Sequence, residues 1–141
     1  MSSFLFHAHS GLRYLVLLAA LVAIVYLGFG LLTRREHDRG ARIVMSAFVG
    51  LLDLQILLGI GLVATGVFYP ALMGHLMMMV LAAAAAHGLS VLSRKAAEPR
   101  RRYGMALAGV VLALLLIVGG ITAIGRGVFS SRTMSGTGQA R

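Results

Sequence analysis

The chain has 141 residues, of which 59% are hydrophobic and only 12% are charged. Soluble domains carry about 25% charged residues, so this composition excludes a soluble globular protein and predicts an integral membrane protein. The sequence contains no cysteine. This excludes disulfides, iron–sulfur clusters and thiol nucleophiles, and it leaves histidine as the main candidate metal ligand.

The net charge of +9 is concentrated in two short segments between apolar runs. Four arginines lie between residues 34 and 42, and five basic residues lie between residues 94 and 102. This distribution is typical of membrane-protein loops and does not indicate a nucleic-acid partner. With four spanning helices both loops lie on the same side, and the positive-inside rule places them in the cytoplasm. We therefore expect a multi-pass membrane protein with both termini on the outer side.

Four apolar segments are long enough to cross the hydrocarbon layer of a bilayer, which needs about 20 residues. The first, about residues 10–32, includes a run without any charge from Tyr14 to Leu32. Three further segments follow, at about residues 43–66, 71–93 and 103–124. Short loops force neighbouring helices to be antiparallel, so the sequence predicts an all-α, up-down-up-down four-helix bundle. We expect a single transmembrane domain over residues 1–125.

Residues 126–141 form a tail that is rich in Gly, Ser, Thr and Arg. Such a composition does not fold on its own. If the tail is ordered, a surface outside the four helices must hold it, and a partner subunit of a larger membrane complex is the expected source of that surface.

Polar residues form a predicted layer at the outer end of the bundle. His9 and Arg13 are four residues apart, so they share one face of a helix. His75 lies about one turn inside the outer end of its own segment, at a similar depth. His7 is interpreted as a flanking residue with no role.

A second polar layer is predicted deeper in the membrane. Asp53 and His87 lie roughly 20 Å and 24 Å from the outer ends of their helices. A charged group at such a depth costs about 3 kcal/mol, which favours a carboxylate–imidazole pair. Gln55 points about 200° away from Asp53 on the same helix. One of these two side chains is therefore expected to face a neighbouring chain, a cofactor or a water-filled cavity.

The histidine spacing limits haem binding to one site. His75 and His87 lie about 18 Å apart along one helix and cannot ligate the same haem. His9 can join His75, since neutral imidazoles on different helices suit the axial positions of haem iron, and Arg13 can pair a propionate. Alternatively, both histidines are simple interfacial residues and Arg13 extends to a lipid phosphate. No metal other than haem iron is predicted.

Three stretches carry a resemblance to a known family: His9-Ser10-Gly11-Leu12-Arg13-Tyr14, Gln55-Ile56-Leu57-Leu58-Gly59, and His75 with its methionine-rich sequel. They resemble small bacterial four-helix membrane proteins described as cytochrome b-like, which open with a His-Ser-Gly-Leu-Arg-aromatic motif. The similarity spans residues 7–125. Similar sequences can have a histidine just before the glutamine, where this chain has Asp53-Leu54-Gln55, so a haem ligand at that place is missing.

Three functions follow from these features, and no catalytic residue is predicted for any of them. The sequence favours a small accessory subunit of a larger respiratory or photosynthetic electron-transfer complex, with bound lipid, quinone or pigment. The alternative is a cytochrome b-like electron-transfer protein with one haem b between His9 and His75. A third hypothesis is a proton-conducting bundle that uses Asp53 and His87, although no broken helix or inverted repeat is predicted. Activity as an enzyme by itself is not expected.

Overall fold

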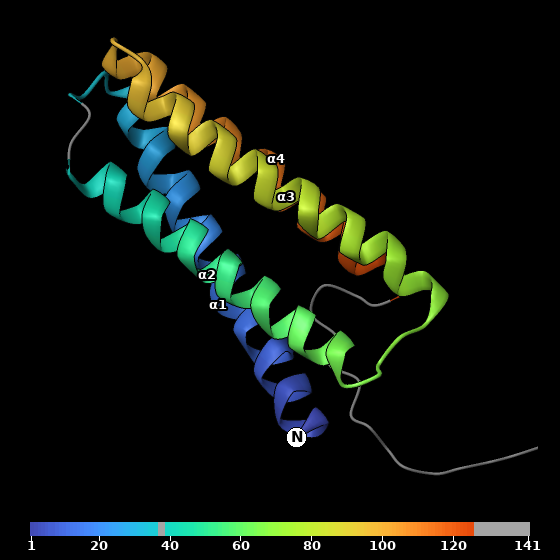
Figure 1. Cartoon of the computed structure of the whole chain (residues 1–141). Coiled ribbons are helices and arrows are strands. Elements are labelled where there is room, and N and C mark those ends of the chain that lie inside the picture. The colour runs from blue at the N-terminus through green and yellow to red at the C-terminus, as the bar shows by residue number, and fades with distance from the viewer. Residues whose placement is uncertain (37–38, 126–141) are drawn as a thin grey trace, which may run out of the picture.

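The computed structural model describes residues 1–36 and 39–125, and the predicted tail at 126–141 lies outside the described residues. The described chain forms four helices, α1 (Ser2–Leu32), α2 (Arg39–Ala64), α3 (Pro70–Lys95) and α4 (Pro99–Ala123) (Figure 1). Each helix is long and apolar enough to cross a membrane. The predicted all-α, four-helix membrane fold is confirmed.

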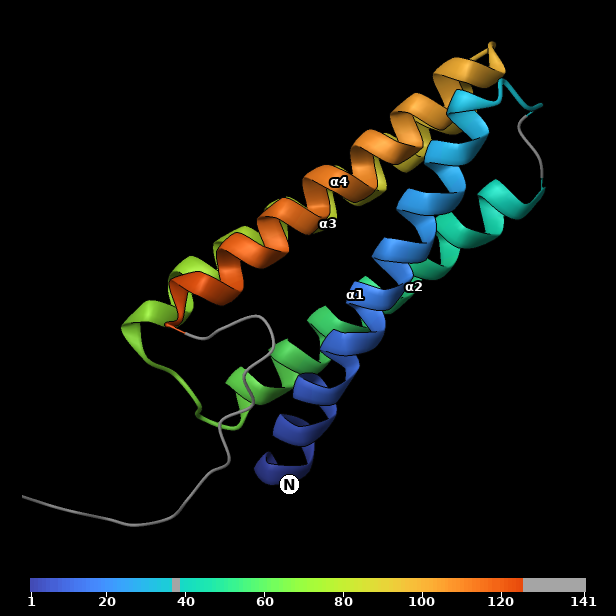
Figure 2. The ribbon, with the colours of Figure 1, turned by 180° about the vertical axis from the view of Figure 1, so that it is seen from behind.

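The helices pack as two antiparallel pairs, α1 with α2 and α3 with α4. The pairs are joined mainly where α1 contacts α4, near the end that carries the basic loops. They spread apart toward the other end, so that the bundle has the outline of a V when seen from either side (Figures 1 and 2). The space between the two arms lies at the end that the sequence places on the outer side of the membrane.

Small side chains fill much of the interface between the helices. Dispersion and close backbone approach drive helix packing in membranes, because lipid is as apolar as the helix surfaces. The core accordingly contains alanines with at most 1% of their surface exposed, among them Ala20, Ala23, Ala82, Ala86, Ala106 and Ala113.

Tyr103 joins the two pairs at the basic end of the bundle. Its side chain is fully buried, and its ring lies where a Cβ atom at Gly30 of α1 would be. The Tyr103 hydroxyl donates a hydrogen bond of 3.2 Å to the main-chain carbonyl of Glu36. The sequence marks Tyr103 as the start of the last helix, whereas its packing against α1 is evident only from the structure.

Helix α1 begins at Ser2, well before the predicted start near residue 10. The predicted start rests on the number of residues needed to cross the hydrocarbon layer. The helix continues beyond the edge of that layer, because no Gly or Pro interrupts residues 2–10. His9, which lies just before the predicted segment of residues 10–32, is therefore within the helix. The other helices also differ from their predicted ends. α2 ends at Ala64 because Gly66 adopts a left-handed φ of 90°, and Pro70 begins α3.

We expect Gly30→Ala to lower the free energy of unfolding by about 1–3 kcal/mol, the usual cost of overfilling a packed interior. The added methyl group would overlap the Tyr103 ring and push α4 away from α1. The measurement is reversible unfolding in mixed detergent micelles. Gly28→Ala is the matched control, because a Cβ there meets nothing within 4 Å. Equal destabilisation by both variants would contradict the assigned packing.

Candidate functional site

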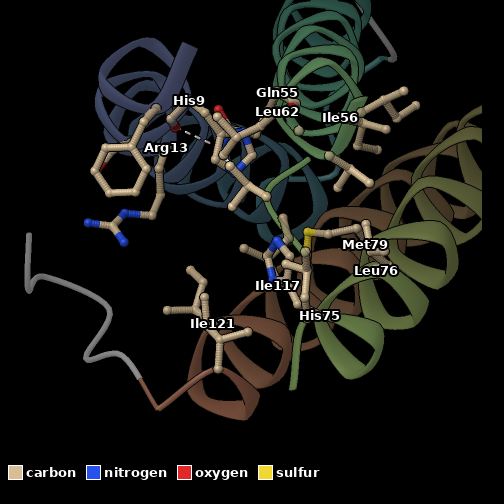
Figure 3. A pocket seen from close by; sticks show the side chains of 18 of the residues that line it. His9, Arg13, Gln55, Ile56, Leu62, His75, Leu76, Met79, Ile117 and Ile121 are labelled. Atoms are coloured by element: carbon tan, nitrogen blue, oxygen red, sulfur yellow. Dashed lines mark hydrogen bonds between the residues drawn. The ribbon is translucent and has the colours of Figure 1, made fainter. Parts of the chain in front are cut away.

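A cavity of about 390 Å³ lies between the two arms of the V. Its volume falls within the usual range of small-molecule sites. All four helices contribute to its wall, which is mostly apolar and includes Leu52, Ile56, Leu76, Met79, Ile117 and Ile121 (Figure 3). The polar side chains at the wall include His9, Arg13, Gln55 and His75. The cavity thus contains every residue of the predicted outer layer.

The imidazole rings of His9 and His75 lie in a T-shaped arrangement at this cavity. Their centroids are 6.4 Å apart, and the ring planes are nearly perpendicular, at 84°. His9 comes from α1 and His75 from α3, which are diagonally opposed helices in the bundle. The structure therefore brings together two histidines that are far apart in the sequence, one from each arm of the V.

A main-chain carbonyl fixes each of these two imidazoles. His9 Nδ1 donates to the carbonyl of Gln55 on α2, and His75 Nδ1 donates to the carbonyl of Gly120 on α4, both at 3.1 Å. A carbonyl oxygen only accepts hydrogen bonds, so the proton of each neutral ring is assigned to Nδ1. Nε2 then carries the lone pair, which can accept a hydrogen bond or bind a metal, as in most metal-ligating histidines.

Two glycines make room for these rings. A Cβ at Gly59 would lie 3.1 Å from His9 Cε1, and a Cβ at Gly120 would lie 3.3 Å from His75 Nδ1. The same Cβ at Gly120 would also lie 2.8 Å from the terminal carbon of Met79. Each imidazole can therefore reach its carbonyl because the neighbouring helix has no side chain at that point. The sequence does not reveal these pairings, since glycine is frequent throughout the chain.

Gln55 faces the interior of the bundle and connects α2 to α1. Its side chain is buried, and its amide nitrogen donates to the main-chain carbonyl of His9 at 2.8 Å. The same nitrogen lies 3.3 Å from His9 Nε2, which accepts in the assigned tautomer. No hydrogen bond to Gln55 Oε1 is found within the described part of the chain. Of Asp53 and Gln55, which the sequence places on different faces of this helix, Gln55 is the one at the cavity.

Arg13 lies one turn after His9 on α1 and is buried, with 8% of its surface exposed. Its Nη2 donates to the Tyr14 hydroxyl at 3.0 Å, and the guanidinium lies 4.9 Å from the centre of the Tyr14 ring. The side chain also contributes to the wall of the cavity, on the same side as His9 (Figure 3). A positively charged side chain therefore forms part of the cavity wall.

Asp53 and His87 form a hydrogen-bonded pair away from this cavity. His87 Nε2 lies 2.8 Å from Asp53 Oδ1. The two side chains are 45% and 51% exposed, and neither belongs to the cavity wall. The pair bridges α2 and α3 on the outer surface of the bundle.

The donor set of the cavity limits the metal chemistry that it can support. Among the described residues, no group of three or more His, Asp or Glu side chains is placed to hold a metal ion. Two opposed imidazoles alone suit a metal whose other coordination positions are already filled, as in haem.

Comparison of the chain with protein families, with curated proteins and with solved structures finds no match. The function must therefore be inferred from the site itself.

We expect a double-mutant cycle of His9→Ala and Gln55→Ala to give a coupling free energy of about 0.6 kcal/mol, and at most about 1.7 kcal/mol, as found for hydrogen-bonded pairs of membrane helices. The control cycle combines His7→Ala with Gln55→Ala, because His7 is exposed on the same helix. Its coupling should be zero within error, as measured by unfolding in detergent. Similar coupling in both cycles would contradict the assigned contact.

Proposed function

We propose that this chain is a cytochrome b-like electron-transfer protein that binds one haem b between His9 and His75. The separation of the two rings carries this proposal. A metal–imidazole bond of about 2 Å, with about 1 Å from the nitrogen to the ring centre, places the two ring centres about 6 Å apart on either side of one metal. The observed separation of 6.4 Å is close to this value.

The surroundings of both histidines support the same assignment. Their Nδ1 hydrogen bonds to carbonyls hold the rings in the tautomer that a metal requires. The side-chain amide of Gln55 donates to His9 Nε2 and to the His9 carbonyl. When His9 Nε2 binds a metal, Gln55 would lose the first of these hydrogen bonds and keep the second. The apolar wall suits a macrocycle, and Arg13 would pair a propionate.

Two axial imidazoles favour electron transfer over catalysis. His9 and His75 would together hold the haem, and the chemistry it would supply between two imidazoles is single-electron transfer. The cavity lies toward the end of the bundle opposite the basic loops, since its wall includes Ser2, Tyr69 and Ile124. We place those loops in the cytoplasm and both termini in the periplasm of a bacterial inner membrane. A redox partner, such as quinone, would then meet this site from the periplasmic side.

The other functional hypotheses stay predictions. The hypothesis of an accessory subunit rests partly on residues 126–141, which lie outside the described residues. The hypothesis of a proton path needs Asp53 and His87 to line an internal route, and the structure places this pair on the outer surface. The haem proposal is preferred because it uses the polar residues that do meet in one cavity.

We expect the purified protein, supplied with haem, to show sharp alpha and beta bands in a reduced-minus-oxidised spectrum. His9→Ala and His75→Ala should each lower the bound haem at least tenfold, because each variant removes an axial ligand. His7→Ala is the matched control and should leave the spectrum unchanged, since the exposed His7 side chain lies on the same helix. The proposal fails if the wild type binds no haem or if all three variants bind it equally.

We also expect Gly120→Ala to weaken haem binding about 10–100-fold, the usual effect of disturbing a group that orients a metal ligand. The new methyl group would displace Met78 or Met79 and push the His75 ring from its carbonyl partner. Gly119→Ala serves as control, because its Cβ comes no closer than 4.0 Å to the terminal carbon of Met78. Haem titration followed at the Soret band measures both variants. Equal affinities would exclude a positioning role for Gly120.

A further inference from the structure

The Asp53–His87 pair occupies an unusual place for ionisable groups in a membrane protein. Asp53 lies near the middle of α2, which runs from Arg39 to Ala64, and is therefore several helical turns from either end. Both side chains are nevertheless about half exposed on the outside of the bundle. Ionisable residues at this depth normally face a bundle interior, a water-filled cavity or another chain.

The pair has further hydrogen-bonding capacity that hydrocarbon cannot satisfy. The bond between them uses Nε2 of His87 and Oδ1 of Asp53. Nδ1 of His87 and Oδ2 of Asp53 remain, and the described part of the chain gives neither of them a hydrogen bond. Lipid tails offer no donor or acceptor. A protein surface must therefore cover this face in the membrane.

The surface around the pair is shaped for close helix packing. Ser46 and Gly50 precede Asp53 on the same face of α2, and Ala84 and Gly88 flank His87 on α3. All four are exposed, and a Cβ added at either glycine would meet nothing within 4 Å. Small residues of this kind let a second helix approach closely.

Other lipid-facing surfaces of the bundle differ from this one. The exposed residues in the middle of α1 and α4 are mostly bulky aliphatic or aromatic side chains, such as Leu18, Leu21, Val25, Phe29, Leu112 and Leu115. Such side chains suit contact with lipid. The combination of small residues with a polar pair is thus a local property of the face shared by α2 and α3.

We propose that this face binds a second copy of the chain, and that Asp53 and His87 of the two copies form a closed ring of hydrogen bonds. A twofold axis beside the pair brings the same surface of both copies together. Nδ1–H of His87 then donates to Oδ2 of Asp53 in the second copy, and the reciprocal bond forms at the same time. Each copy contributes one carboxylate and one imidazole, so the two positive and two negative charges balance when both imidazoles are protonated.

A second copy fits this face better than an unrelated subunit. It supplies one acceptor and one donor at the required spacing, because its own pair has the same geometry. An unrelated chain would have to bring both groups independently. The proposal does not depend on haem binding, since the pair lies outside the cavity.

The absence of cysteine from the sequence allows a clean crosslinking test in native membranes. Gly50→Cys and Gly88→Cys would each be oxidised in the full chain with copper phenanthroline. We expect a disulfide-linked species of twice the chain mass of 14.9 kDa. Leu21→Cys on α1 and Leu115→Cys on α4 are matched controls, because both positions are exposed to lipid on other faces. They should give at least tenfold less dimer.

An exchange of the two polar residues tests the hydrogen-bonded ring itself. Asp53→His and His87→Asp should each lower the dimer fraction at least tenfold in single-molecule photobleaching. The double variant carries both groups in exchanged places and should recover dimerisation, which also shows that the chain still folds. Crosslinking at all four positions, crosslinking only to a protein of different mass, or monomers in the wild type would each overturn the proposal.

Discussion

A ring packed on a glycine of the neighbouring helix is the contact on which this structure depends. Within residues 1–36 and 39–125 this contact occurs three times: Tyr103 on Gly30, His9 on Gly59, and His75 on Gly120. In each case the ring also donates a hydrogen bond to a main-chain carbonyl. The glycine lets the helix backbones approach, and the hydrogen bond satisfies a polar group that lipid would leave unpaired. These contacts connect α4 to α1, α1 to α2 and α3 to α4.

The position of the contacts determines the position of the cavity. The contact between Tyr103 and Gly30 joins the two arms at the basic end. Each of the two histidine contacts instead joins the two helices of one arm. The arms therefore separate toward the other end, and the imidazoles of His9 and His75 project from opposite walls into the space between them. Each of these two imidazoles donates a hydrogen bond to a main-chain carbonyl of the other helix in its own arm.

Much of the fold and part of the candidate site can be predicted from the sequence. Long uncharged runs specify the four helices, and residue counting places His9 and His75 at one depth. The rotation of each helix about its own axis cannot be predicted in the same way. Because α2 and α3 have apolar residues on nearly every face, hydrophobic periodicity does not identify the face that is buried. For this reason the inward direction of Gln55 and the outward direction of Asp53 and His87 required the structure. The pairing of rings with particular glycines depends on this rotation as well.

Because the two arms of the V meet at one end, small rotations at that end cause larger movements at the open end. Tyr103 lies near the start of α4 and Gly120 near its end, so a small rotation at the Tyr103 contact becomes a larger displacement of the arm that carries His75. The distance between the two imidazoles is therefore sensitive to small changes in the angle between the arms. A ligand held by both rings would fix that angle, and a change in the packing at the end with the basic loops would alter the affinity for that ligand through the same rotation. The end of the bundle most distant from the cavity is thus well placed to regulate it.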